Sequence, residues 1–168
     1  MLYVYEPTSR DMEELRQIRN DCRLFMTRDQ TEITPERQAE WWERKCRGLE
    51  RLFLFSNTQR NFAGYDFETD PKGTSIPHNV GYGRIFNAGG DSYWLLSGGL
   101  KSEFRGKGLG KELFAYLTRY VEDMFNGVPV LEVLASNERA IHVYLDLGYQ
   151  IKTTVAGAFG SVYIMSKL

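Results

Sequence analysis

The strongest pattern in the sequence is a run of apolar residues with helical spacing, formed by Leu109, Leu113, Leu117, Tyr120, Val121 and Met124. These positions follow the period of an α-helix and predict an amphipathic helix. Segments near residues 92–100 and 130–134, before and after this run, have the composition of strands. A strand, a helix and a second strand in this order require a right-handed crossover, so this half of the chain is expected to be α/β.

Shorter patterns predict the other elements. Polar N-cap residues before apolar periodicity, and glycines after it, mark the helix ends. Strands are expected at residues 2–5, 51–55, 80–86, 149–153 and 162–165, and helices at residues 9–22, 35–47 and 137–148. Residues 57–79 are expected to form a long loop or a hairpin extension. The order β-α-α-β-β-β-α-β-α-β-β predicts one α/β domain over residues 1–168, with a mixed, mostly antiparallel sheet flanked by helices.

Composition narrows the class of protein. The 168 residues include 21 Lys and Arg against 22 Asp and Glu, a formal net charge of −1, and this balance disfavours nucleic-acid binding. No apolar run approaches the roughly 20 residues that span a bilayer, and the N-terminus does not have the pattern of a signal peptide. Cys22 and Cys46 lack metal-ligand spacing, which predicts reduced thiols and no metal. We expect a cytoplasmic protein without a membrane partner.

A glycine-rich segment precedes the strongest helix, with the sequence Glu103-Phe104-Arg105-Gly106-Lys107-Gly108-Leu109-Gly110-Lys111. A P-loop would need glycine at position 105 and Ser or Thr at position 112, where Arg105 and Glu112 stand. A dinucleotide-binding fingerprint starting at Gly106 would need glycine in place of Lys111. The pattern that fits is Arg-x-x-Gly-x-Gly, which ends at Gly110.

Such a turn can hold an anion. Glycines let successive backbone N–H groups approach a pyrophosphate, and the start of the helix adds a favourable dipole. Arg105, Lys107 and Lys111 would add charged donors around the same anion. The alternative that needs no ligand is a glycine-rich turn with a solvated basic rim.

This segment resembles motif A of the Gcn5-related N-acetyltransferases, the GNAT superfamily, which hold the pyrophosphate of acetyl-CoA in this way. Residues 134–149 resemble motif B of the same superfamily. There Asn137 would cap the helix, Ala140 and Tyr144 match its Ala-x-x-x-Tyr, and Gly148 precedes the closing aromatic residue. The element order also matches, so the resemblance implies a GNAT-like fold with acetyl-CoA as cosubstrate.

The resemblance also implies roles for individual residues. Leu100 stands where a strand backbone polarises the acetyl carbonyl, next to paired glycines that usually indicate a bulge or a close backbone approach. Asn137 is expected to cap its helix and to reach the pantetheine arm. Tyr144 is the implied catalytic residue, donating a hydrogen bond or proton to the departing thiolate; otherwise it is a core tyrosine. The cofactor-binding set is Leu100, Arg105, Gly106, Lys107, Gly108, Leu109, Gly110, Lys111 and Asn137.

The sequence offers no compelling general base. Trp94 stands at or near the position where some relatives carry a catalytic glutamate. The weaker candidates are His78, Asp91, Ser97 and Glu103, and His142 is expected to face solvent. Transfer of the amine proton to solvent or a water chain is the alternative.

The function that follows is transfer of an acetyl group from acetyl-CoA to a primary amine, by direct attack in a ternary complex. The segments Ile18-Arg19-Asn20 and Ile33-Thr34-Pro35-Glu36, with Trp41-Trp42, loosely resemble two GNAT subgroups, which acetylate ribosomal-protein N-termini and aminosugars. The alternative is that the two helices carrying these segments only pack against the core. A small metabolite or aminosugar amine is favoured over a protein N-terminus or lysine, with a monomer or homodimer expected. A catalytically silent acyl-CoA sensor is the alternative from another class.

Overall fold

A computed structural model describes residues 1–46, 48, 50–58, 79–90 and 92–167 of the 168. The predicted loop at residues 57–79 falls almost entirely outside the described residues. Short 3₁₀ turns η1 (Ser9–Asp11), η2 (Arg23–Phe25) and η3 (Ser102–Phe104) supplement the main elements. In chain order these are β1 (Tyr3–Tyr5), α1 (Met12–Asp21), α2 (Pro35–Cys46), β2 (Arg51–Ser56), β3 (Asn79–Asn87), β4 (Tyr93–Leu100), α3 (Leu109–Phe125), β5 (Val128–Leu134), α4 (Glu138–Asp146), β6 (Gln150–Gly157) and β7 (Gly160–Ser166).

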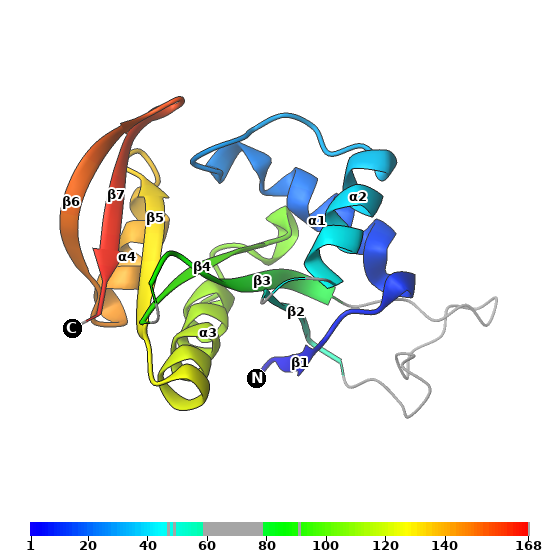
Figure 1. The fold of residues 1–168 in the computed structure, drawn as a ribbon, viewed down its shortest axis with the longest axis horizontal. Coiled ribbons are helices and arrows are strands. Elements are labelled where there is room, and N and C mark those ends of the chain that lie inside the picture. The colour runs from blue at the N-terminus through cyan, green and yellow to red at the C-terminus, as the bar shows by residue number, and fades with distance from the viewer. Residues whose placement is uncertain (47, 49, 59–78, 91, 168) are drawn as a thin grey trace.

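The predicted element order is confirmed, and the described strands form one mixed sheet. Its strand order is β1-β2-β3-β4-β5-β7-β6, and all neighbours are antiparallel except the β4–β5 pair. The parallel pairing of β4 with β5 begins at Tyr93 and Val128 and ends at Leu96 and Leu131, although both strands continue. Beyond that point the two strands diverge, as Figure 1 shows. The sheet therefore opens at its centre.

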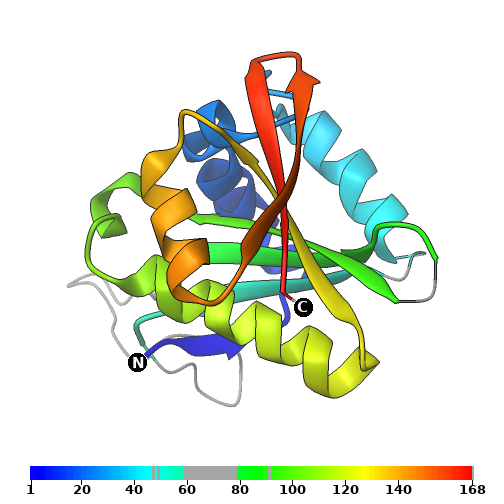
Figure 2. The same cartoon turned by 90° about the vertical axis from the view of Figure 1, so that its left-hand side faces the viewer.

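Helices cover both faces of the sheet (Figures 1 and 2). On one face, α3 and α4 pack over a core that includes Leu113, Leu117 and Tyr144. On the other face, Leu15 and Ile18 of α1 pack against Leu52, Leu54 and Tyr82 of the central strands, with Trp41 and Trp42 of α2 at the edge of this second cluster. The apolar run predicted for α3 is buried at Leu113, Leu117 and Val121, whereas Met124 near its end is 65% exposed.

Local signals explain where the helices around the opening begin. The backbone N–H of Arg37 donates to the Thr34 hydroxyl at 3.3 Å, which caps α2 ahead of Pro35. Asn137 caps α4, its Oδ1 accepting the backbone N–H of Ala140 at 3.3 Å. Gly108 precedes α3 with φ +79°, a conformation that favours glycine. The starts of α2 and α4 were predicted from these residue types, and that of α3 from the apolar period that begins at Leu109.

The paired glycines of β4 mark a close backbone approach rather than a bulge, because the β3–β4 register runs without a shift from Gly81/Leu100 to Asn87/Trp94. A Cβ on Gly98 would lie 2.5 Å from the backbone oxygen of Tyr82 on β3. A Cβ on Gly99 would lie 2.6 Å from the Cys22 sulfur on the opposite side. Glycine at these positions lets β4 pack closely against β3 and α1.

We expect the substitution Gly98→Ala to lower the free energy of unfolding by about 1–3 kcal/mol, because a backbone atom of β3 must move to admit the methyl group. The matched control is Gly110→Ala, where the new Cβ would meet only a Leu100 side-chain atom at 3.8 Å. Urea unfolding of the two variants measures the difference. Equal stabilities for the Gly98 variant and the parent would contradict the close approach.

Candidate active site

A cavity of about 680 Å³ opens where β4 and β5 diverge. Its walls come from both faces of the sheet. One half is lined by the glycine turn, the start of α3 and α4, and the other by α1, η2 and the central strands. A volume of this size suits a small-molecule site rather than a packing defect. We call these the glycine half and the arginine half of the cavity.

The glycine turn has the conformation needed for an anion cradle. Gly106 and Gly108 have φ of +77° and +79°, and around Gly108 no heavy atom lies within 4 Å of the place a Cβ would occupy. The first N–H groups of a helix have no intrahelical partner. At the start of α3 these belong to Leu109 and Gly110, and Gly110 lines the cavity. Open space next to unpaired backbone donors is what a bound phosphate requires.

The guanidinium of Arg105 does not face the glycine turn, where the sequence analysis expected it to bind the anion. Its Nε donates to the Leu100 carbonyl at 3.0 Å, and its Nη2 donates to the Asp21 carbonyl at 2.9 Å and lies 3.4 Å from the Asp21 carboxylate. The guanidinium also lies 5.0 Å from the ring centroid of Phe25. Arg105 lines the cavity, but these contacts direct its charge toward the end of α1 and away from the turn.

Other cations surround the glycine turn. Lys111 lines the cavity and pairs with Asp146 of α4 at 3.0 Å, on the surface. Lys107 and Leu109 are not among the residues that line the cavity. The sequence analysis missed Arg139, an exposed residue of α4 whose Nη1 lies 3.8 Å from the Cβ position of Gly106. The sequence signal that could have indicated Arg139 was its position two residues after Asn137, in the first turn of the same helix.

The backbone of Leu100 points into the divergence of the strands. Lys101 donates its N–H to Val80 of β3 at 2.9 Å, so these two residues form a hydrogen-bonded pair of the antiparallel ladder. Because such pairs alternate, the neighbouring pair of Leu100 and Gly81 is not hydrogen-bonded, and the Leu100 N–H and C=O point away from β3. Its carbonyl accepts hydrogen bonds from Arg105 and from the Cys22 thiol. The N–H of Leu100 is therefore the group left to bind in the opening.

Tyr144 of α4 lines the cavity. It is 7% exposed and packs edge-on against Phe114, with ring centroids 4.9 Å apart. Its hydroxyl makes no hydrogen bond to any described residue, whereas the neighbouring Tyr149 hydroxyl bonds to Thr118 at 2.7 Å. Burial raises the pKa of Tyr144 above its ordinary value, so the phenol stays protonated at neutral pH and can donate a hydrogen bond.

The candidate bases lie in different surroundings. Ser97 lines the cavity, beside the hydroxyl of buried Tyr82, whose pKa burial raises to about 12. Glu103 is exposed on η3 outside the cavity, and His142 is exposed on α4, as expected. Trp94 packs on Phe125 in the core, with ring centroids 3.9 Å apart. His78 and Asp91 lie outside the described residues.

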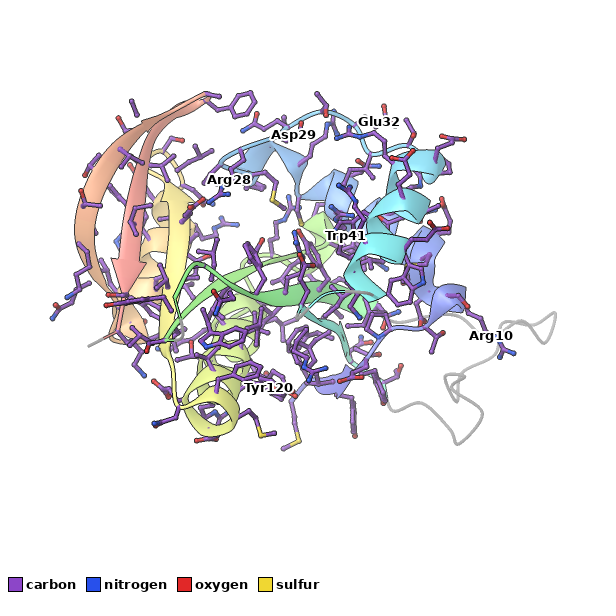
Figure 3. The ribbon with its side chains drawn as sticks, in the orientation of Figure 1. Arg10, Arg28, Asp29, Glu32, Trp41 and Tyr120 are labelled. Carbon is purple, nitrogen blue, oxygen red and sulfur yellow. The ribbon has the colours of Figure 1, made fainter. Side chains whose placement is uncertain are left out.

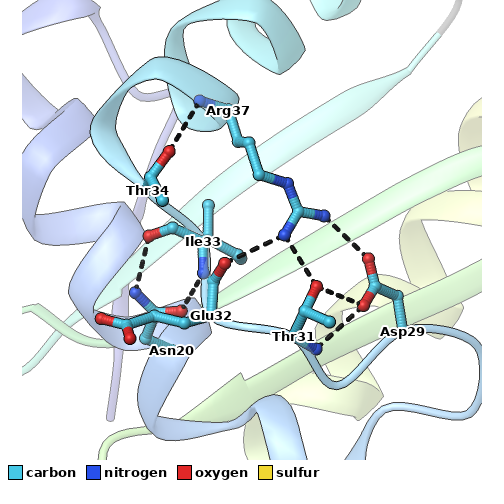
Figure 4. Close-up of polar contacts among 7 residues, drawn as sticks. All are labelled: Asn20, Asp29, Thr31, Glu32, Ile33, Thr34 and Arg37. Atoms are coloured by element: carbon cyan, nitrogen blue, oxygen red, sulfur yellow. Dashed lines mark hydrogen bonds and ion pairs between the residues drawn. The ribbon is translucent and has the colours of Figure 1, made fainter.

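A segment formed by residues 26–34, here named the crossing segment, runs over the arginine half between η2 and α2 (Figure 3). Arg28 and Thr27 bind Glu132 of β5, with an Arg28–Glu132 distance of 2.6 Å. Figure 4 shows the contacts from Asp29 onward, where Arg37 of α2 pairs with Asp29 at 2.8 Å and Asn20 of α1 exchanges hydrogen bonds with the Ile33 backbone. The β6–β7 hairpin lies against it, since a Cβ on Gly157 would be 3.8 Å from the Thr27 oxygen. These contacts restrict entry to this half.

The remaining chemistry of the site is simple. Within the described part of the chain, no group of three or more His, Cys, Asp or Glu residues could hold a metal ion. Burial raises the pKa of the Cys22 thiol to about 11, so this buried thiol is neutral. The side chain of Cys46 is outside the description. No helix in the described residues is long and apolar enough to cross a membrane.

Comparisons with known proteins give the family and the fold of the chain. A family model described as the acetyltransferase (GNAT) family matches residues 12–149. No curated protein matches the chain in sequence. Among solved structures, spermidine N-acetyltransferase from Vibrio cholerae, in complex with CoA and spermine, superposes with a TM-score of 0.77 at 16% identity, over 98% of this chain and 94% of that one.

Two further structures are similar. The structure of yncA from Salmonella typhimurium with its cofactor acetyl-CoA superposes with a TM-score of 0.73 at 15% identity, covering 99% of this chain and 92% of that one. Ribosomal-protein-alanine N-acetyltransferase from Brucella melitensis gives 0.73 at 20% identity, over 99% of each chain. At these identities the likeness concerns the fold.

Proposed function

Because this chain belongs to the acetyltransferase (GNAT) family, we propose that it transfers an acetyl group from acetyl-CoA to the primary amine of a small metabolite, such as an aminosugar. The observation that carries the proposal is the opening of β4 from β5, which joins the glycine cradle, the Leu100 N–H and the Tyr144 hydroxyl in one cavity. Relatives in the same fold bind acetyl-CoA or CoA, which supports the choice of cosubstrate.

The residues of the glycine half fit this cosubstrate. The N–H groups at the start of α3 and the open space at Gly108 suit a pyrophosphate, and Lys111 and Arg139 would supply charge on either side. Asn137 lines the cavity with its Oδ1 engaged in the cap, which leaves the Nδ2 donor for an amide carbonyl of the pantetheine arm. Arg105 contributes by holding the Leu100 carbonyl, so that β4 keeps its angle to α1.

Two groups of the chain can act on the reacting atoms. Acetyl-CoA supplies an acetyl group on a thioester, which an amine attacks at the carbonyl carbon while the carbon–sulfur bond breaks. The Leu100 N–H can stabilise the charge that develops on the carbonyl oxygen. Tyr144 can hydrogen-bond to the departing sulfur, because a tyrosine phenol is protonated across the neutral range and burial raises its pKa further.

Among the described residues that line the cavity, no unpaired carboxylate is available to receive the amine proton. Glu132 lines the cavity, but hydrogen bonds from Arg28 lower its pKa and make it a weak base. Ser97 beside Tyr82 can hold a water that accepts the proton and passes it to solvent. The proposal therefore uses a water route instead of a dedicated base.

The acceptor is proposed to be small because of the way the arginine half is enclosed. The crossing segment is held by ion pairs at Arg28 and Asp29 and by hydrogen bonds between Asn20 and the Ile33 backbone, and the β6–β7 hairpin lies against it. The whole cavity has a volume of about 680 Å³, which must hold the acetyl-bearing arm together with the acceptor. A protein N-terminus would have to pass beneath the crossing segment.

The experiment that tests the function measures thiol release from acetyl-CoA with a panel of amines, and identifies products by mass spectrometry. The panel holds aminosugars, amino acids, polyamines and a peptide with a free N-terminus. We expect acetylation of at least one small amine at a saturating rate. Acetylation of the peptide alone would replace the small acceptor with a protein one, and acetyl-CoA binding without any turnover would favour an acyl-CoA sensor.

Substitution of Asn137 separates its two proposed roles. Serine at this position still caps a helix, whereas alanine does not. We expect Asn137→Ser to retain stability, and Asn137→Ala to lose about 1 kcal/mol of unfolding free energy. Both variants should bind acetyl-CoA roughly 3- to 10-fold more weakly, because each lacks the amide donor. Urea unfolding and calorimetry measure the two effects; unchanged affinity in the serine variant would leave Asn137 as a cap alone.

A further inference from the structure

The arginine half of the cavity has an unusual balance of charge. Its charged lining residues are the acids Asp29 and Glu132 and the arginines Arg19, Arg23, Arg28, Arg37 and Arg84. Both acids are already paired, Asp29 with Arg37 at 2.8 Å and Glu132 with Arg28 at 2.6 Å. A positively charged acceptor, such as a polyamine, would meet no unpaired carboxylate among the described residues of this lining.

Arg19 is the clearest unpaired charge. Its guanidinium lies 4.3 Å from the ring centroid of Trp41 on α2 and donates to the Gln38 side-chain oxygen at 2.6 Å. It makes no ion pair with a carboxylate among the described residues. Burial, together with the neighbouring Arg84, lowers the pKa of Arg19 from its ordinary value, but an arginine remains charged at neutral pH. Burying a cation without a counter-ion is unfavourable unless a ligand compensates it.

Arg84 lies beside the same tryptophan. Its guanidinium is 5.4 Å from the Trp41 ring centroid and 4.9 Å from that of Phe86. Glu50 pairs with its Nη2 at 2.8 Å, but the Arg84 Nε is buried with no partner in the described residues, as is the second Glu50 oxygen. Glu50 offsets one of the two positive charges, and one positive charge remains.

The position of these two arginines fits a substrate group. Arg84 on β3 lies directly opposite Ser97 on β4, just past the point where β4 leaves β5. The two strands are separated by one interstrand spacing, about 4.8 Å. Because Arg19, Arg84 and Ser97 line one cavity, a group bound by the two arginines would share that cavity with an amine placed at the opening.

We propose that the acceptor carries an anionic oxyacid group, a carboxylate or a phosphate, close to its amine, and that Arg19 and Arg84 bind this group. The inference rests on the proposed acetyltransferase function and specifies its substrate class. The planar fork of each guanidinium matches two oxygens of such a group. The Trp41 ring holds the Arg19 guanidinium in place by stacking.

Matched pairs of amines test the proposal at saturating acetyl-CoA. Glycine is compared with glycinamide for the carboxylate, glucosamine 6-phosphate with glucosamine for the phosphate, and spermidine serves as the cationic amine. We expect at least one anionic member to exceed its neutral partner by 10-fold or more in kcat/KM. The pair of amines that shows this difference tells whether the bound group is a carboxylate or a phosphate. Equal or better turnover of both neutral partners, or preference for spermidine, would overturn the proposal.

Variants then locate the anion site. Arg19→Gln and Arg84→Gln should each lower kcat/KM for the preferred anionic amine at least 10-fold through KM, with little change for its neutral partner. Arg44→Gln, an exposed residue of α2 outside the cavity lining, is the control and should behave as the parent. An unchanged preference in both cavity variants, with folding verified by circular dichroism, would contradict the assignment.

Calorimetry with acetyl-CoA separates the two claims. Both arginines lie in the half of the cavity away from the glycine turn, so their variants should bind acetyl-CoA as the parent does. A parent that does not bind acetyl-CoA would refute the proposed function itself. Binding of acetyl-CoA with turnover of neutral amines alone would refute the anion site only, and binding without turnover of any amine in the panel would count against both.

Discussion

Replacing Tyr144 by phenylalanine should lower kcat by about 10²-fold or more, while the affinity for acetyl-CoA stays nearly the same. Tyr144 lines the cavity and its hydroxyl bonds to no described residue, so removal of the hydroxyl leaves none of these residues without a partner. The interaction that is lost develops only as negative charge appears on the leaving sulfur, and general acid catalysis of this kind contributes about 10²–10⁴-fold. Steady-state kinetics with calorimetric titration of acetyl-CoA measures both quantities.

Tyr149→Phe is the matched control for this prediction. The Tyr149 hydroxyl is also on the α4 side of the core, but it bonds to Thr118 and does not line the cavity. Its loss should destabilise the fold and leave kcat unchanged. A Tyr144→Phe enzyme with the parent's kcat would remove Tyr144 from the chemical step.

Gly110→Val should weaken acetyl-CoA binding by roughly 10- to 100-fold. A Cβ at this position finds ordinary space in the protein itself, 3.8 Å from a Leu100 methyl group, so the branched side chain would occupy the cavity rather than displace the core. It would keep a phosphate away from the first N–H groups of α3, and one hydrogen bond to a charged group is worth about 1.5–3 kcal/mol. Calorimetry gives the dissociation constant.

Two variants control for other effects of this substitution. Arg119→Val, at an exposed position of the same helix, carries the same cost of a β-branched residue in a helix without touching the cavity. Gly110→Ala adds a smaller side chain and should give an intermediate affinity. Parent-like affinity in Gly110→Val would mean that no phosphate approaches the helix at this point.

Local sequence signals were sufficient for most of the elements. The apolar period from Leu109 predicted α3, and Asn137 and Gly148 predicted both ends of α4, because caps and periodicity depend on residues close in sequence. Two of the expected cofactor-binding residues, Lys107 and Leu109, have side chains outside the cavity, since spacing alone does not fix which way a turn faces. Their backbone contribution stays a prediction.

The arrangement of the arginines could not be predicted in the same way. Arg105 follows the expected turn, but its guanidinium reaches the end of α1, some 84 residues earlier in the chain. Arg19, Trp41 and Arg84 come from three separate elements, and only the packing of α1 and α2 on β3 brings them together. Neither pattern has a local signature, because each depends on tertiary contacts.

Calorimetric titration of acetyl-CoA into the purified protein tests the central claim most directly, with dephospho-CoA and ATP as controls. We predict saturable binding of one acetyl-CoA per chain that tolerates added salt and is stronger than binding of either control. The absence of detectable binding to a folded sample would contradict the account, and the glycine segment before α3 would then be a turn without a ligand.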